Sequence, residues 1–178
     1  VDADTCASPR TYEAALHAIG AANAAVDDVF AQTVSNVFVA ARPPGHHAEK
    51  TTAMGFCLFN TAAIAARHAQ RTHGAERIAI VDWDVHHGNG TQDIFWDDPT
   101  VLYCSTHQMP LYPGTGAKDE TGVHGTIRNA PLRPQDTGDQ FREAFKGEVL
   151  TRQGNQHRLG RTTEEFDMTD RLRLAQIT

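Results

Sequence analysis

Two clusters of histidine and aspartate residues are the part of this sequence that could do chemistry. His46 and His47 are adjacent in a stretch rich in proline and glycine, and Asp82, Asp84 and His86 alternate directly after a short apolar run. Because side chains alternate along a strand, we expect the second group to point to one side. Carboxylate oxygen combined with imidazole nitrogen suits Zn²⁺ or a similar divalent ion. The sequence therefore predicts a metal site with histidines beside it.

Each cluster also has a simpler interpretation. The second cluster is compatible with a solvated turn held by aspartate and asparagine side chains, with Gly88 and Gly90 supplying the loop geometry. For His46 and His47, the alternative to a general base with an electrostatic partner is one ring packed on the loop and the other in solvent. A catalytic imidazole needs a carboxylate or amide that fixes its tautomer, so the alternatives differ in whether each ring has such a partner.

Predicted strands and helices alternate around these clusters. The sequence predicts buried strands at 37–40, 78–81 and 100–105, helices at 9–32, 60–73, 92–96, 141–150 and 162–177, and loops at 42–45 and 110–125. Gly74 is expected as the residue just beyond the second helix. The alternation predicts a mainly parallel sheet between helices, a three-layer α-β-α fold. Ligands in such folds bind at the carboxyl ends of the strands, where both clusters are expected.

Length and composition narrow the class of protein. The 178 residues suffice for one domain, and the formal net charge of -6 argues against partners such as nucleic acid or an anionic membrane. No apolar run approaches the roughly 20 residues of a membrane helix, and residues 1–4 lack the features of a signal peptide. Three separated cysteines without a Cys-x-x-Cys pair fit a reducing compartment. We therefore expect a cytoplasmic protein.

Four ordered motifs between residues 37 and 131 resemble the histone deacetylases. The motifs are Arg-Pro-Pro-Gly-His-His-Ala at 42–48, Gly-Phe-Cys-Leu-Phe-Asn at 55–60, Asp-Trp-Asp-Val-His-His-Gly-Asn-Gly-Thr at 82–91 and Leu-Tyr-Pro-Gly-Thr-Gly at 111–116. Trp83 and Asn89 are similar to the class II branch and its bacterial relatives. The resemblance implies the arginase/deacetylase-like α/β fold in a single domain, and hydrolysis of acetyl-lysine or a related acetylated amine such as an acetylpolyamine.

The resemblance also implies catalytic roles. His47 matches the general base, which takes a proton from a zinc-bound water and returns it to the leaving amine. His46 matches a histidine that contributes mainly electrostatically. Asp82 matches the carboxylate that orients His46, and Asn89 matches the partner of His47. The implied reaction is metal-assisted amide hydrolysis, in which zinc polarises the acetyl carbonyl and acetate leaves.

Cations and a substrate channel complete what the resemblance implies. Asp84 and His86 match two of three zinc ligands, and Phe56 and Tyr112 match the aromatic pair that holds the acyl-lysine stem. From the residues alone, Phe56 and Tyr112 are as readily explained as core aromatics. A structural potassium site (K⁺) is implied at Asp82, Asp84, His86, Ser105 and Thr106, with a second one near Phe95.

The sequence departs from the family pattern after the helix predicted at 141–150. An aspartate on a later strand, the third zinc ligand of the family, is not found, and neither is the tyrosine that stabilises the oxyanion; residues 151–161 are polar instead. His157 or Asp167 could replace the ligand only if the fold brought it to the site. Val1 in place of an initiator methionine indicates that the chain begins inside a longer protein or was processed. We therefore expect an incomplete, partial deacetylase domain over residues 1–178.

Three functional hypotheses follow from the sequence. The first is an active zinc-dependent deacetylase, and the second is a non-catalytic remnant of the fold that binds metal or a partner without turnover. The third, an unrelated metal-binding module, is disfavoured by the order of the motifs. The sequence identifies neither the particular acetylated substrate nor whether the chain forms a homo-oligomer.

Overall fold

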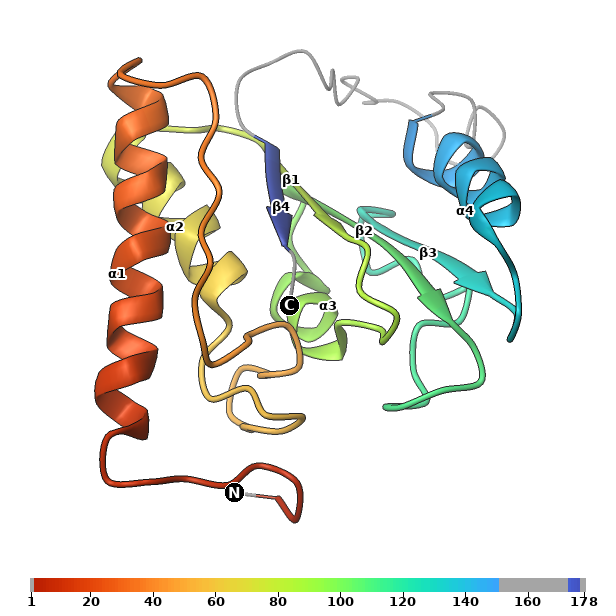
Figure 1. The fold of residues 1–178 in the computed structure, drawn as a ribbon. Helices are drawn as coiled ribbons and strands as arrows, with labels where there is room; N and C mark the ends of the chain where they lie inside the picture. The colour runs from red at the N-terminus through yellow and green to blue at the C-terminus, as the bar shows by residue number, and fades with distance from the viewer. Residues whose placement is uncertain (1, 151–172, 177–178) are drawn as a thin grey trace.

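A parallel sheet crosses the molecule in the computed structural model, which describes residues 2–150 and 173–176 (Figure 1). The four strands are β1 (Ile78–Asp82), β2 (Val101–Gln108), β3 (Ile127–Leu132) and β4 (Arg173–Gln176), in the order β3-β2-β1-β4. Every pairing is parallel, and Asp82 at the end of β1 lies opposite Ser105 of β2. The predicted parallel α/β fold is confirmed, as are the strands predicted at 78–81 and 100–105.

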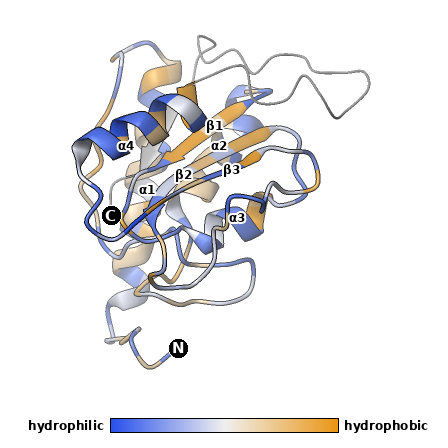
Figure 2. Cartoon of the chain, turned by 90° about the vertical axis from the view of Figure 1, so that its right-hand side faces the viewer, coloured by the Kyte–Doolittle hydropathy of each residue, from blue (hydrophilic) through white to orange (hydrophobic). Residues whose placement is uncertain are grey.

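Helices cover both faces of this sheet (Figures 1 and 2). They are α1 (Thr11–Phe30), α2 (Thr61–His73), α3 (Asn89–Phe95) and α4 (Gly138–Ala144), the last continued by a π-helical segment, Phe145–Leu150. Figure 2 shows α4 in front of the strands and α1 and α2 behind them, so the predicted three-layer arrangement is confirmed. Within the described ranges, no helix combines the length and apolar character needed to span a membrane.

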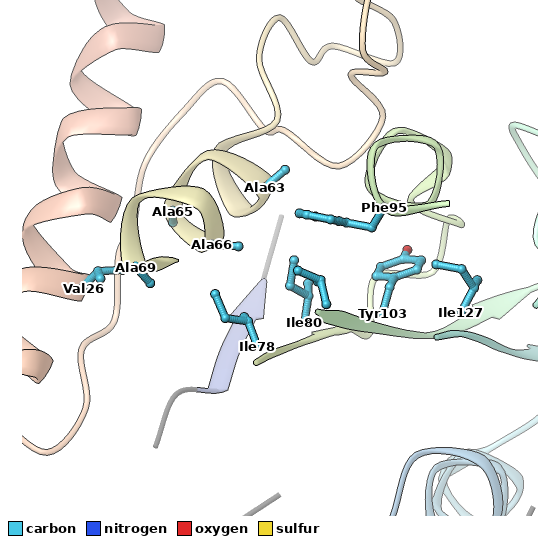
Figure 3. Close-up of a cluster of buried hydrophobic side chains, with 11 residues drawn as sticks. Val26, Ala63, Ala65, Ala66, Ala69, Ile78, Ile80, Phe95, Tyr103 and Ile127 are labelled. Carbon is cyan, nitrogen blue, oxygen red and sulfur yellow. The ribbon is translucent and has the colours of Figure 1, made fainter. Parts of the chain in front are cut away.

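Both faces of β1 and β2 are buried, which explains the continuous apolar runs at 78–81 and 101–104. On the face toward α2 and α3, Ile78, Ile80 and Tyr103 pack with Phe95 (Figure 3). On the opposite face, the smaller residues Ala79, Leu102 and Cys104 pack against Val149 of the π-helical segment. Figure 2 shows β1 and β2 as largely hydrophobic. The buried residues that α2 gives to the core are alanines: Ala63, Ala65, Ala66 and Ala69.

Helix α2 is capped at both ends, by the Asn60 side chain at its beginning and by Gly74 at its end. The Asn60 side-chain oxygen accepts the Ala63 N–H at 3.0 Å, which satisfies one of the free donors of the first turn. The Asn60 side-chain amide donates to the Ala48 carbonyl at 3.3 Å and to the Thr91 hydroxyl at 3.0 Å. Gly74 ends the helix at φ +68°, as predicted. Asn60 therefore connects α2 to the loop 42–48 and to α3.

The strand predicted at 37–40 does not form. Residues 36–41 are unpaired, and the Phe38 side chain is 72% exposed. The free edge of β1 is occupied by β4 instead. An apolar, β-branched run indicates a strand only if a sheet edge is available to it, because its backbone groups need partners.

Three further expectations at the carboxyl-terminal half are revised. Residues 173–176, predicted as the end of a helix over 162–177, form strand β4 because they pair with β1. Residues 162–172 and 177 of that prediction lie outside the described residues. Strand β3 was not predicted because Arg128, Asn129 and Pro131 interrupt its apolar pattern. The helix predicted at 141–150 begins at Gly138 and is π-helical from Phe145.

Candidate active site

The candidate site lies where β1 ends and the loop 42–48 meets the beginning of α3. Thr91 in α3 donates its N–H to the His46 carbonyl at 3.1 Å, which holds the loop against the helix. At Gly90, a Cβ would lie 2.2 Å from the Ala48 carbonyl oxygen. Because no side chain fits into that space, the close approach of the two backbones depends on a glycine at this position.

His46 is held by a buried carboxylate at the end of β1. Its Nδ1 donates to Asp82 Oδ2 at 2.9 Å, and the exposed fraction of both residues is 2% or less. The same carboxylate accepts the Tyr103 hydroxyl at 3.1 Å and the Asp84 N–H at 3.2 Å. Burial, followed by the negative charge of Asp82, raises the pKa of the Tyr103 hydroxyl, which therefore stays protonated. The predicted partnership of Asp82 with His46 is present.

His47 has a different partner, the side chain of Asn89. The Asn89 Nδ2 donates to Glu49 Oε1 at 2.8 Å, so its Oδ1 faces the His47 Nδ1 at 2.8 Å. An amide oxygen only accepts, so the His47 proton resides on Nδ1 and the Nε2 lone pair is free. Burial and the neighbouring His46 lower the pKa of His47 to about 4, which keeps the ring neutral at pH 7. This geometry favours the catalytic interpretation over one packed and one solvated histidine.

Asp84 and His86 lie in a turn beyond the strand, so it is the turn and not strand alternation that positions their side chains. Strand β1 ends at Asp82. The Asp84 Oδ1 accepts the His86 N–H at 2.7 Å and lies 3.1 Å from the His86 Nδ1. Asp84 thus stabilises a turn, as the solvated-turn interpretation predicted. The same turn brings a carboxylate and an imidazole donor together, as the metal-site interpretation predicted.

The fit of this pair to zinc is partial. An adjacent carboxylate oxygen and imidazole nitrogen are suitable donors, but catalytic zinc normally has three protein ligands. Within the part of the chain that the structure describes, no third histidine, cysteine or carboxylate converges with Asp84 and His86. His157 and Asp167 lie outside the described residues.

Three of the residues expected around potassium lie on neighbouring strands, Asp82 on β1 and Ser105 and Thr106 on β2, while Asp84 and His86 lie in the turn after β1. Ser105 pairs with Asp82, and Thr106 follows it. The Thr106 side chain is buried, and its hydroxyl has no hydrogen-bond partner. An unsatisfied buried oxygen of this kind is compatible with a bound cation. The Phe95 side chain is completely buried in the core at the end of α3, so only its backbone could contribute to a second ion.

Two aromatic side chains expected at a channel are exposed rather than part of the core. Tyr112 is 41% exposed, and its ring lies edge-on to His47 at 5.0 Å between centroids. Its ring is 6.2 Å from that of His86. Phe56 is 62% exposed. A Cβ at the preceding Gly55 would lie 2.5 Å from His47 Cδ2, so the Gly55–Phe56 turn is packed onto that histidine.

A buried polar network beneath the site was not predicted. His87, next to His86 in sequence, donates its Nε2–H to Gln92 Oε1 at 3.1 Å, and its Nδ1 accepts the Thr115 hydroxyl at 2.8 Å. Burial and the neighbouring His107 lower the pKa of His87 to about 4. Gln92 donates to Glu120 at 2.5 Å, which extends the network to the loop 110–125. The signal available in the sequence was His87 itself, which directly follows His86 and so falls outside the alternation of Asp82, Asp84 and His86.

Comparison with known proteins places these features in a family. A family model described as the histone deacetylase domain matches residues 1–157. An uncharacterized protein of Synechocystis sp. is 52% identical over 150 residues, which are 84% of this chain and 49% of the relative. "Histone deacetylase 14, chloroplastic" of Arabidopsis thaliana is 50% identical over 143 residues, covering 76% of this chain and 34% of the relative.

The fold is shared with a solved structure of the same family. The crystal structure of the HDA15 HD domain superimposes with a TM-score of 0.70 at 48% sequence identity, over 73% of this chain and 38% of that one. The chain thus spans less than half the length of each of these relatives.

Proposed function

Because this chain belongs to the histone deacetylase family, we propose that its site hydrolyses the amide bond of an acetylated amine with His47 as the proton acceptor. The observation that carries the proposal is the pairing of His47 Nδ1 with Asn89 Oδ1 at 2.8 Å, which leaves Nε2 free beside the Asp84–His86 turn. A neutral imidazole with a free lone pair can accept a proton at pH 7, and the imidazolium formed can return it to the leaving amine.

His46 has a supporting role in this proposal. Its ring lies 4.0 Å from that of His47 between centroids, and its Nδ1 is committed to Asp82. A histidine hydrogen-bonded to a buried carboxylate is fixed in its tautomer and orientation. We propose that His46 contributes electrostatically and transfers no proton to the amine.

Zn²⁺ is the metal that we propose for this site, with Asp84 and His86 as two ligands. When bound, zinc would polarise the acetyl carbonyl and activate water. A third protein ligand would have to come from outside the described residues, since those residues offer two. We further propose that the oxygen atoms near Ser105 and Thr106 hold a structural potassium ion.

The substrate that we propose is acetyl-lysine or an acetylpolyamine. Both carry the acetyl group at the end of a flexible alkyl chain. Exposed aromatic rings beside a polar site provide apolar contact for such a chain, and Phe56 and Tyr112 are placed near His47 in this way.

A second candidate is a non-catalytic deacetylase fold that binds a metal or a partner without turnover. The observation that favours it is the pair of zinc donors in place of three among the described residues. Because both candidates retain the fold, it is turnover that distinguishes them.

The test is hydrolysis of an acetyl-lysine peptide and of an acetylpolyamine by the purified chain, with zinc content measured by mass spectrometry before and after zinc addition. We expect chelator-sensitive turnover, and His47→Ala should lower kcat by about 10²-fold or more, the usual contribution of a general base. His124→Ala is the matched control, because His124 is a partly exposed histidine whose partner is Asp97. Zinc-loaded chain without turnover would establish the non-catalytic alternative, and unchanged turnover in His47→Ala would exclude the role of that residue.

A further inference from the structure

A second group of metal-ligating side chains lies between the carboxyl-terminal ends of α1 and α2. His68 and His73, both on α2, direct their Nε2 atoms at Asp27 on α1. The distances to Asp27 Oδ1 are 2.6 Å from His68 and 2.7 Å from His73. One ligand atom from each of the three side chains lies within 4.8 Å of the others, and no other group of three such side chains occurs in residues 2–150.

Both imidazoles approach the same carboxylate oxygen. Hydrogen bonds from His73 and His68 lower the pKa of Asp27, so the carboxylate is ionised at neutral pH. In the absence of a metal, each Nε2 must carry a proton to donate to that oxygen. Two nitrogens and one oxygen thus surround a small space that two protons occupy, and a single cation could replace both protons.

The surroundings of the rings suit a ligand role. The His68 Nδ1 lies 3.2 Å from the Thr72 hydroxyl, which can donate to it when Nε2 is protonated or accept from it when Nε2 binds a metal. A hydrogen bond of this kind to the second ring nitrogen usually accompanies metal-ligating histidines. The His73 ring stacks on Phe30 of α1 at 4.5 Å between centroids and 5° between planes, which fixes its orientation.

The three side chains are partly open to solvent. The side chains of His68 and His73 are each 22% exposed, and that of Asp27 is 50% exposed. The partly buried rings have little freedom to move apart, while the carboxylate can move and water can reach the space.

We propose that Asp27, His68 and His73 form a second metal site, which binds a divalent transition metal such as Zn²⁺ and links α1 to α2. Two imidazole nitrogens and one carboxylate suit Zn²⁺ or its neighbours, whereas Ca²⁺ and Mg²⁺ prefer oxygen ligands. Zinc–ligand bonds of about 2.0–2.1 Å in a tetrahedron place the ligand atoms about 3.3 Å apart. The side chains would therefore separate by a fraction of an ångström, and water would complete the coordination.

The second site is independent of the candidate active site. Asn60, at the amino-terminal end of α2, contacts the site loop, whereas His73 is the last residue of the helix. A rise of 1.5 Å per residue separates these ends by roughly 18 Å. The link would act at an interface whose buried residues on the α2 side are alanines, which pack little apolar surface against α1.

The experiment uses the full chain with Asp84→Asn and His86→Asn, which remove the donors of the active site. After dialysis against micromolar zinc, we expect about one bound zinc per chain and a melting temperature raised by several degrees. Adding His68→Asn and His73→Asn should abolish both effects. His17→Asn is the control, because His17 is an exposed histidine on α1 and should leave zinc binding unchanged.

Zinc bound equally with and without His68 and His73, or no zinc bound by the chain that retains them, would overturn the proposal. Asp27→Asn keeps the size of the side chain and one acceptor oxygen, so it tests the site even if the histidine variants fail to fold. We expect that variant to weaken zinc binding at least tenfold, and unchanged binding would also overturn the proposal. Because the active-site donors are absent throughout, the result does not depend on whether the chain is a deacetylase.

Discussion

Two regions of the molecule each bring a pair of histidines together with carboxylates, but they do so in different ways. At the carboxyl end of β1, His46 and His47 are buried, and each ring has its own partner, Asp82 or Asn89. Between α1 and α2, His68 and His73 are partly exposed and share one oxygen of Asp27.

The difference teaches what a histidine pair is arranged to do. Separate partners hold the rings of His46 and His47 in distinct orientations, which suits two distinct roles in moving and stabilising charge. A shared carboxylate directs both Nε2 atoms of His68 and His73 to one point, which suits a single cation. The buried pair is held by partners from the end of β1 and from α3, whereas the partly exposed pair is brought to its partner by the packing of two helices.

Removal of the central carboxylate in each region should give the largest contrast. Asp82→Ala would leave the buried Nδ1 donor of His46 unpaired and remove one hydrogen-bond partner of the Tyr103 hydroxyl, so we expect a loss of about 3–5 kcal/mol in the free energy of unfolding. Asp27→Ala should cost far less in metal-free buffer, because its carboxylate is half exposed. Urea titration at pH 7 measures both. Equal losses would show that burial does not distinguish the regions.

Mild acid should destabilise the buried region. His87, below the site, has a pKa lowered to about 4 by burial and by His107, against about 6.5 when unfolded. Between these values the unfolded chain binds the extra proton, so stability is complete above pH 6.5 and falls toward pH 4, by on the order of 3 kcal/mol. Unfolding titrations across this range check the slope.

A matched pair of variants separates His87 from the other histidines in this test. His87→Gln should make the acid slope shallower without removing it, because one group whose protonation differs between the folded and unfolded chain is lost while His47, whose pKa is also lowered to about 4, remains. His17→Gln on α1 should leave the slope as it is. An unchanged slope in His87→Gln would mean that other groups cause the acid sensitivity.

Replacing a glycine with alanine should have opposite effects on stability in the two regions. Gly90→Ala places a Cβ 2.2 Å from the Ala48 carbonyl oxygen, so the site loop must shift, and we expect a loss of about 1–3 kcal/mol. Gly20→Ala, within α1, meets nothing within 4 Å, and we expect a gain of about 0.5–1 kcal/mol from better helix propensity. The melting temperature should fall in Gly90→Ala and rise in Gly20→Ala. A stabilising Gly90→Ala would contradict the close approach described for the site loop.

Sequence reasoning predicted the site better than the elements around it. The resemblance to the histone deacetylases implied the pairings of His46 with Asp82 and of His47 with Asn89, and both contacts are present in the structure. Strand pairing is a long-range property. Residues 37–40 have the composition of a strand and remain unpaired, whereas residues 173–176, which carry a helix-like pattern, pair with β1.

The second region was absent from the predictions for a similar reason. His68 and His73 lie five residues apart on α2, a spacing that does not match the helical period. The residue that contacts both, Asp27, lies on α1, far away in sequence. Nothing in a local pattern indicates that the three meet. The packing of α1 on α2 creates that group, and packing is decided by the whole core.

The three hydrogen bonds of the Asn60 side chain have a consequence for how the protein opens. They tie the first turn of α2 to the loop 42–48 and to α3. Amide hydrogens exchange with solvent in cooperative units rather than one at a time. The Ala63 amide should therefore exchange together with that of Thr91, and more slowly than the fraying of a helix end would allow. The helix and the loop that carries His46 and His47 would then open as one unit.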